Sequence, residues 1–237
     1  MKILALDAAT EVCSVAVWDG ENVFERRSDI PKSHAQQLLP LVDEVLSAAA
    51  TDLASIDAIA VTHGPGSFTG IRIGIGIAQG LSYGAKIPAI GVNTLEVMAQ
   101  GYVNRHPSYN GYLVPALDAR MAEVYWGVYR VENGILFEYK AAQVCAPENV
   151  TEYCEANLPS CYTALGHGWK VIATPAASVQ VDPEWMPRAS AIVQVAERQT
   201  IAQIETSAIA EPPLEPLYLR NEISWKKRQR IRPPNSL

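Results

Sequence analysis

The hydrophobic pattern of the first third of the chain predicts three short strands. Apolar residues dominate residues 2–10 and 12–19, and a third, more polar run covers 22–28. Asp19-Gly20 separates the second and third runs and is a strong hairpin signal, because both residue types tolerate the left-handed backbone of a tight turn. The chain therefore begins with a β-meander.

Helical spacing follows this meander. Ser33 and Gln36 have the form of a capping box, and Pro40 should bend the helix near its start. The apolar residues of this helix recur every three to four positions, at Leu38, Leu39, Leu41, Val42, Val45, Leu46 and Ala49. Further strands are expected at 56–64 and 87–93, on either side of a glycine-rich helix. The order βββαβαβ indicates an α/β fold.

The second half of the chain begins in the same way as the first. Apolar runs cover 112–120, 123–131 and 135–144, and Asn133-Gly134 marks a second hairpin. The first strand of each half ends in aspartate, at Asp7 and Asp118. This repetition indicates a duplicated architecture.

A cluster of Gly, Asn, His and Pro at residues 101–111 marks a boundary between the halves. We expect an N-terminal lobe at 1–104 that carries the glycine-rich helix, a smaller C-terminal lobe at 105–215, and a tail at 216–237. Within the second lobe the pattern predicts a strand and turn at 164–171, a helix at 190–202, and an extended proline-rich segment at 211–221.

Composition places the chain among ordinary soluble proteins. It has 237 residues, of which 49% are hydrophobic, so it can bury a sizeable core. No apolar run is long enough to span a membrane and the N-terminus lacks a signal-peptide pattern, so we expect a cytoplasmic protein. The four cysteines contain no C-x-x-C pair, and isolated reduced thiols are expected.

The formal net charge of −6 conceals a basic tail. From Arg220 to the C-terminus there are six Lys or Arg residues and one Glu. Lys226, Lys227, Arg228 and Arg230 are candidates for contact with RNA phosphates or with an acidic partner. A solvated terminus without a partner is the other interpretation.

The glycine-rich helix is the most unusual element of the pattern. Each glycine inside an exposed helix costs about 1 kcal/mol relative to alanine, so close packing has to offset several such costs. Two rows of small residues recur at every fourth position. They are Gly70, Gly74 and Ala78 in one row, and Gly76, Gly80 and Gly84 in the other. The helix is expected to be approached closely by another backbone.

The turn before this helix, from Gly64 to Gly70, matches no common catalytic motif. A P-loop needs Lys and a hydroxyl after its last glycine, whereas Ile71 and Arg72 stand there. The spacing also misses the dinucleotide fingerprint and the nucleophile elbow. Two interpretations remain, which are a purely structural turn and a weak anion site at the helix N-terminus.

Six segments together resemble a known bacterial family over nearly the whole chain. They are ILALDAATEVCSVAV, SHAQQLLPLV, HGPGSFTGIRIGIGIAQGL, IPAIGVNTLEVMAQ, LDARMAEVYW and PLYLRNEISWK. The chain resembles the tRNA threonylcarbamoyladenosine biosynthesis proteins called TsaB or YeaZ. The resemblance implies two actin-like lobes of the ribonuclease H-like (ASKHA) superfamily, each a mixed sheet with flanking helices.

The resemblance also implies a role and partners. The family belongs to the complex that forms N6-threonylcarbamoyladenosine beside the anticodon of tRNAs reading codons that begin with A. Its partners are the catalytic sister TsaD and the ATPase TsaE, with tRNA reached through the complex and a homodimer formed by the free protein. ATP or ADP is expected only at the complex interface, and not on this chain alone.

Comparison with the sister predicts that this chain is not catalytic. Thr94 and Met98 occupy the positions of the sister's two metal-binding histidines, so no metal site and no peptidase activity are expected. Asp7, Thr10, Gly64 and Gly66 are the candidates for nucleotide or phosphate contact. A weak ATPase or phosphotransferase in the cleft between the lobes is the alternative function.

The resemblance gives the glycine-rich helix a partner. We expect it to pair, together with the helix after Ser33, with the same face of a second copy or of the sister. The expected interface residues are Leu38, Leu41, Val45, Gly70, Gly74, Ala78 and Gly80. The other interpretation is that the glycine rows pack only against the sheet of this chain. The main hypothesis is a non-catalytic scaffold or activating subunit.

Overall fold

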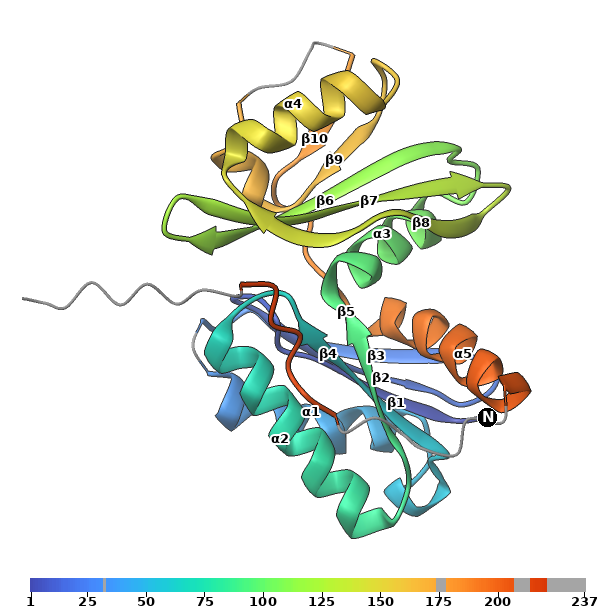
Figure 1. Cartoon of the computed structure of the whole chain (residues 1–237). Coiled ribbons are helices and arrows are strands. Elements are labelled where there is room, and N and C mark those ends of the chain that lie inside the picture. Colours follow the sequence, from blue (N-terminus) through green and yellow to red (C-terminus); the bar gives the residue numbers. More distant parts are fainter. Residues whose placement is uncertain (32, 174–177, 207–213, 221–237) are drawn as a thin grey trace, which may run out of the picture.

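A computed structural model describes residues 1–31, 33–173, 178–206 and 214–220, and it contains two mixed sheets with helices between and around them (Figure 1). The first sheet has the strand order β3-β2-β1-β4-β5. Its strands are β1 (Ile3–Asp7), β2 (Cys13–Trp18), β3 (Val23–Ser28), β4 (Ala58–Gly64) and β5 (Ala89–Asn93). The first three are antiparallel, and β4 and β5 run parallel to β1.

Alternation along β1 sends side chains into two cores. Leu4 and Leu6 pack under α1 (His34–Ala48) and α2 (Phe68–Ala85). Ile3 and Ala5 point to the opposite face, where α5 (Ala189–Thr206) lies. All of these β1 side chains are fully buried, as expected for a central strand covered by helices on both faces.

The second sheet has the order β10-β9-β6-β7-β8. Its strands are β6 (Gly111–Arg120), β7 (Glu123–Glu132), β8 (Ile135–Cys145), β9 (Thr163–Leu165) and β10 (Gln180–Asp182). On one face lies α4 (Pro147–Asn157), and its Val150 and Cys154 side chains pack in one core with Trp126. On the other face α3 (Thr94–Arg105) inserts Leu95 and Met98 between the two sheets, so α3 joins the lobes. Two 3₁₀ turns, Leu53–Ser55 and His167–Lys170, complete the described elements.

The structure confirms the α/β class, the element order of the first half and both hairpins. Asn133 and Gly134 adopt the left-handed backbone that the turn requires. The strand and turn at 164–171 and the helix at 190–202 are also present. The prediction of a capping box is wrong, because the Ser33 hydroxyl donates to the Ile30 carbonyl and does not cap α1. Pro40 lies within an unbroken α1.

Helix α5 returns to the first sheet although it follows the second sheet in the chain. Ala189, Ile192 and Val195 pack against Ile3 and Ala5. The Ser14 hydroxyl accepts a hydrogen bond from the Ala189 amide at 2.9 Å. Residues 189–196 therefore complete the core of the first lobe, although they fall in the range expected for the second. The lobe boundaries at 104 and 215 stay a prediction.

Candidate partner-binding surface

The two rows of small residues on α2 have different surroundings: one row packs against the rest of the chain, and the other faces outward. A Cβ atom on Gly70 would lie 2.1 Å from the Ala8 carbonyl oxygen, and one on Gly74 would lie 3.3 Å from Val61 Cγ2. Ala78, the next member of this row, is fully buried. This inner row lets α2 lie directly on the β1–β2 turn and on β4, where larger side chains do not fit.

The outer row of α2 meets no other part of the described chain. A Cβ atom on Gly76, Gly80 or Gly84 would have no atom within 4 Å beyond its own helix. Large aromatic side chains stand near the two ends of this row, Phe68 with 66% and Tyr83 with 89% of their surface exposed. We call Phe68, Gly76, Gly80, Tyr83 and Gly84 the outer surface of α2. The outer surface is a bare helix backbone between two exposed rings.

The structure corrects most of the interface predicted from the sequence. Six of its seven residues are buried in the core of this chain. They are Leu38, Leu41, Val45, Gly70, Gly74 and Ala78. Only Gly80 is exposed. Four-residue periodicity identifies two rows on a helix, but which row faces the sheet depends on tertiary packing.

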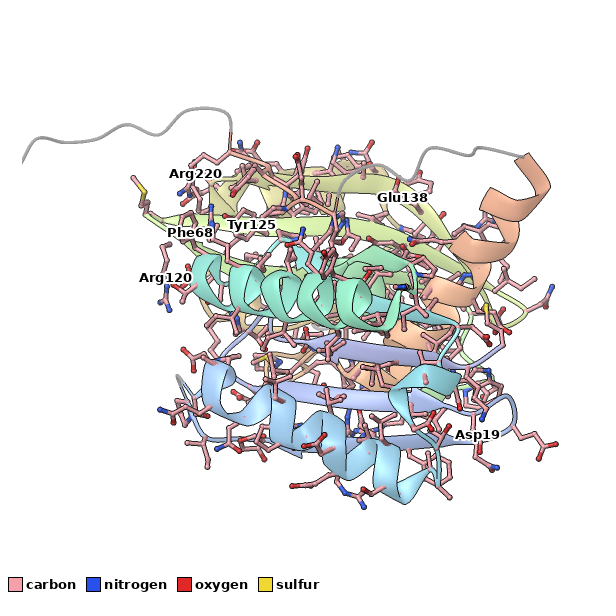
Figure 2. The ribbon with its side chains drawn as sticks, turned by 90° about the horizontal axis from the view of Figure 1, so that it is seen from below. Asp19, Phe68, Arg120, Tyr125, Glu138 and Arg220 are labelled. Atoms are coloured by element: carbon pink, nitrogen blue, oxygen red, sulfur yellow. The ribbon has the colours of Figure 1, made fainter. Side chains whose placement is uncertain are left out.

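Arg72 occupies the N-terminal end of the same helix beside the outer surface. Its guanidinium carbon lies 3.3 Å from the centroid of the Phe68 ring and 5.4 Å from that of Tyr218. The guanidinium also donates to the Tyr218 hydroxyl and to the Phe68 carbonyl. These contacts fix the Phe68 ring and the arginine together at the exposed end of α2, the end that Figure 2 marks with the label of Phe68.

Tyr218 belongs to a C-terminal strap, residues 214–220, which runs along α2. The Leu217 amide donates to the His63 carbonyl at 2.8 Å, and His63 Nδ1 donates to the Glu215 carbonyl at 3.2 Å. Gln79 of α2 donates to the Leu214 carbonyl at 3.1 Å. The sequence indicated an extended segment here but not its position, because no local pattern specifies a contact about 150 residues away.

The strap ends on the second lobe. Arg220 donates to the Glu123 carboxylate and to the Ala119 carbonyl at the β6–β7 hairpin. The strap therefore connects α2 of the first lobe to a hairpin of the second. His63 therefore makes two of the hydrogen bonds that hold the strap. Burial lowers the pKa of the His63 imidazole, and its hydrogen bond to the Glu215 carbonyl partly opposes this shift.

The glycine-rich turn is closed against the chain itself. The Ser67 amide donates to the Ala9 carbonyl at 2.7 Å, and the Ser67 hydroxyl accepts from the Gly70 amide at 3.2 Å. A Cβ atom on Gly66 would lie 2.2 Å from the same Ala9 oxygen. The Ser67 and Gly70 amides are thus already bonded within the chain, and this geometry favours the structural interpretation of the turn.

Asp7 is buried beside this turn and does not face a cleft. Its Oδ1 accepts from the Thr62 hydroxyl at 2.7 Å and from the Ala9 amide at 3.2 Å, while Oδ2 has no hydrogen-bond partner. Burial raises the pKa of Asp7 to about 6. The Thr10 hydroxyl is also buried without a partner, and the Thr10 carbonyl contacts His34 Nε2 at 2.9 Å. These contacts hold the first turn in place.

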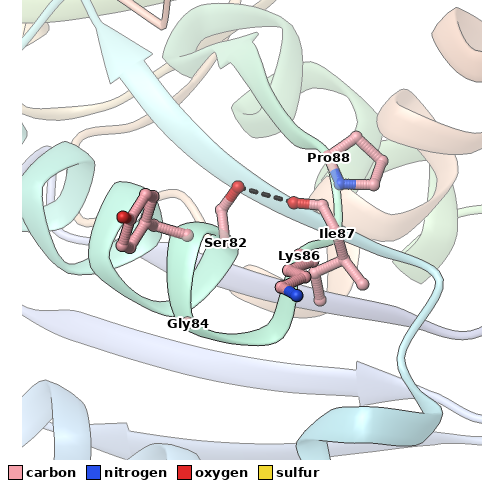
Figure 3. Close-up of a pocket in the computed structure, with 6 residues that line it drawn as sticks. Ser82, Gly84, Lys86, Ile87 and Pro88 are labelled. Atoms are coloured by element: carbon pink, nitrogen blue, oxygen red, sulfur yellow. Dashed lines mark hydrogen bonds between the residues drawn. The ribbon is translucent and has the colours of Figure 1, made fainter.

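A shallow depression of about 770 Å³ adjoins the C-terminal end of the outer surface (Figure 3). It is lined by Ser82, Tyr83, Gly84, Lys86, Ile87 and Pro88. Lys86 ends α2 in the left-handed conformation, and the Ser82 hydroxyl donates to the Ile87 carbonyl at 2.5 Å. The depression extends the outer surface, because Tyr83 and Gly84 belong to both.

Comparisons with known proteins identify the family of this chain. The model of the TsaD family, tRNA N6-adenosine threonylcarbamoyltransferase, matches residues 28–223. The tRNA threonylcarbamoyladenosine biosynthesis protein TsaB of Escherichia coli strain K12 is 42% identical, over 96% of this chain and 98% of that protein. The chain belongs to the TsaB family. The TsaB protein of Haemophilus influenzae is 35% identical over 96% of this chain and 97% of its own length.

A solved structure of the family has the same fold. YeaZ from Pseudomonas aeruginosa superposes with a TM-score of 0.79 at 32% identity, covering 92% of this chain and 99% of its own. The two-lobe α/β architecture is therefore that of the TsaB family. None of the helices in the described part of the chain is long and apolar enough to cross a membrane.

The structure places the predicted Thr94 and Met98 positions of this TsaB-family chain, but not the predicted sites in its tail. Thr94 and Met98 are fully buried at the start of α3, and neither carries an imidazole. Among the described residues no three His, Cys, Asp or Glu side chains come together as a metal site would require. Lys226, Lys227, Arg228 and Arg230 lie outside the described residues.

Proposed function

We propose that this chain is an accessory subunit in the biosynthesis of N6-threonylcarbamoyladenosine in tRNA. Its relatives are named for that pathway, and the chain matches them over nearly its full length. In this proposal the chain performs no chemistry of its own, and the threonylcarbamoyl group is transferred by a TsaD-type sister. A TsaE-type ATPase and the tRNA join through the complex, and nucleotide binds only where subunits meet.

The outer surface of α2 is the observation that carries the proposal. Exposed glycines weaken a helix, because each costs about 1 kcal/mol relative to alanine. Gly76, Gly80 and Gly84 have no internal contact that offsets this cost. A second helix crossing this row can approach more closely than side chains would allow, and Phe68 and Tyr83 supply apolar area beside it.

The same surface serves two occupants in this proposal. When the chain is alone, a second copy packs its own α2 against the row and forms a homodimer. When the sister is present, a similar helix of the sister replaces the second copy. The chain then biases the conformation of the sister through contacts that only the active state makes.

Gly80→Leu tests this pairing directly. Leucine at an exposed helical position improves helix propensity, so the variant should fold at least as well as the parent. Its side chain should block close helix approach and weaken binding to the TsaD-type sister at least tenfold in calorimetric titration. Ala156→Leu makes a matched change at an exposed helical position on α4 and should bind as the parent does.

Two results would overturn the proposal. One is a Gly80→Leu variant that binds the sister with unchanged affinity. The other is formation of modified tRNA by this chain without the sister, because an accessory subunit has no such activity.

A further inference from the structure

The tip of the β6–β7 hairpin has a backbone conformation that its residues do not favour. Met121 and Ala122 form a two-residue turn between Arg120 and Glu123, and both are left-handed, with φ of 57° and 60°. Arg120 is left-handed as well, with φ of 63°. We call residues 120–122 the tip. A Cβ atom makes this conformation costly for each of the three residues, so contacts from outside the turn have to offset the strain.

The other hairpin of the same sheet has the residues that such a turn prefers. Between β7 and β8 the turn residues are Asn133 and Gly134, with φ of 52° and 78°. Asparagine followed by glycine is strongly preferred where both turn residues are left-handed. The chain therefore builds one of these hairpins from favourable residues and the other from unfavourable ones.

The strap supplies contacts on both sides of the tip. One guanidinium nitrogen of Arg220 donates to the Ala119 carbonyl at 3.3 Å, just before the tip, and to the Glu123 carboxylate, just after it. The other nitrogen lies 3.5 Å from Met121 Sδ, within the turn. Arg220 and Glu123 are only partly exposed, so salt screens this pair less than an exposed one. Arg220 thus spans the tip and holds its two ends together.

The strap also contacts α2, two residues before Arg220. The Tyr218 hydroxyl accepts from Arg72, whose guanidinium stacks on the Phe68 ring of the outer surface. Figure 2 shows Phe68, Arg120 and Arg220 toward the same end of the molecule. A continuous series of contacts therefore leads from the outer surface of α2, through Arg72, Tyr218 and Arg220, to the tip.

The tip in turn contacts the first lobe. The Arg120 guanidinium lies 4.0 Å from the Glu11 carboxylate, in the turn between β1 and β2, and 3.1 Å from that of Asp118. Arg120 and Glu11 are both 77% exposed, so their ion pair is too weak to offset the strain of the tip. The conformation of the tip therefore decides whether this contact between the lobes forms.

We propose that the strap couples the outer surface of α2 to the tip. Arg220 holds the tip in its left-handed conformation, and the tip relaxes when the strap is released. A sister subunit that covers Phe68 restricts Arg72 and Tyr218, so it favours the docked strap and the left-handed tip. The effect of the sister rests on the proposed function, whereas the effect of Arg220 on the tip does not.

A double-mutant cycle in the free chain tests the effect of Arg220. The reporter is hydrogen exchange at the Arg120 amide, which donates to Asp118 Oδ1 at 2.7 Å, corrected for intrinsic rate. Arg220→Gln should reduce its protection at least tenfold, because the strained turn loses the contacts that hold it. In a chain with Met121→Asn and Ala122→Gly the turn is favourable by itself, so Arg220→Gln should reduce the protection less than twofold.

Ala50→Gly is the matched control for the added glycine. Ala50 is exposed and left-handed like Ala122, with φ of 46°, but it follows α1. In the Ala50→Gly background Arg220→Gln should still cause the full tenfold loss. An equal loss in all backgrounds would overturn the inference, because Arg220 would then act only through its own hydrogen bonds. So would an Arg220→Gln chain whose tip is as protected as that of the parent.

Sister binding tests the other half of the coupling. At concentrations that saturate each chain, the TsaD-type sister should raise protection of the Arg120 amide at least fivefold in the parent. Tyr218→Phe, which removes the acceptor for Arg72, should abolish most of this increase. An increase that Tyr218→Phe leaves intact, or no increase in a chain that binds the sister, would overturn the coupling. A chain that does not bind the sister contradicts the proposed function as well, while the result of the cycle in the free chain still stands.

Discussion

Gly70 and Gly80 lie on the same helix, yet a methyl group at each would meet opposite surroundings. At Gly70 it would collide with the Ala8 carbonyl, whereas at Gly80 it would project into open space. The first glycine is required by packing within the chain. Packing within the chain does not require the second glycine, and in our account Gly80 allows a partner helix to approach closely.

Alanine at these two positions should therefore change stability in opposite directions. Gly70→Ala should lower the free energy of unfolding by about 3 kcal/mol or more, because backbone has to move. Gly80→Ala should raise it by up to about 1 kcal/mol in the free chain through helix propensity. Urea denaturation of the parent, Gly70→Ala and Gly80→Ala chains, under conditions where each chain is monomeric, measures both effects. Equal effects at the two sites would contradict the division into inner and outer rows.

Asp7 makes a second prediction at the residue scale. Its pKa is raised to about 6 by burial, so the folded state holds the proton more tightly than the unfolded state, whose pKa lies near 3.8. The contribution of Asp7 to stability is therefore greatest below pH 4 and falls as the pH rises to 6. The total loss is on the order of 3 kcal/mol.

Asp7→Asn should remove this loss, since the amide oxygen can still accept from Thr62 and Ala9. The difference in unfolding free energy between parent and variant should change between pH 4 and 6 and be constant above pH 7. Asp43→Asn, at an exposed position on α1, is the control for a general charge effect. A pH-independent difference for Asp7→Asn would show that the carboxyl is ionised throughout.

Among the elements, the strap makes one of its hydrogen bonds to the half-buried imidazole of His63. Burial lowers the pKa of His63 below the usual 6.5, because protonation places a charge in a partly desolvated site. The folded state then binds fewer protons than the unfolded state, so stability is lost as the pH falls below about 6.5. The strap should be the first element to respond.

His63→Gln should flatten this response while keeping a donor near the Glu215 carbonyl. Hydrogen exchange at the Leu217 amide, corrected for intrinsic rate, reports the strap alone. In the parent its protection should fall between pH 7 and 5.5, and in the variant it should not. The same loss in both proteins would place the pH response elsewhere.

Elements governed by local signals were predictable from the sequence. Asp19-Gly20 and Asn133-Gly134 located both hairpins, and apolar periodicity located α1 and α2. The return of α5 to the first sheet was not predictable, because it follows from burial of Ala189 and Ile192 against a strand far away in the chain. The same holds for α2. Its two rows of small residues look alike in the sequence, and only the tertiary packing decides which row faces the sheet.

At the scale of the whole molecule, the chain is a two-lobed body, and the surface that we propose for a partner lies on its first lobe. The strap crosses from α2 to the β6–β7 hairpin, so an event at α2 has a direct physical route to the second lobe. The closed glycine-rich turn argues against an independent nucleotide enzyme. Both features agree with the role that we propose for this chain as a subunit of an assembly.

In our account this chain supports tRNA modification through the outer surface of α2. The most direct test is a reconstituted threonylcarbamoyl-transfer assay with the TsaD-type sister, the TsaE-type ATPase and tRNA, to which the parent, Gly80→Leu or Ala156→Leu chain is added. We predict that Ala156→Leu supports modification as well as the parent does, and that Gly80→Leu reduces it in proportion to its weaker binding of the sister. Full modification by a Gly80→Leu chain that no longer binds the sister would contradict the account.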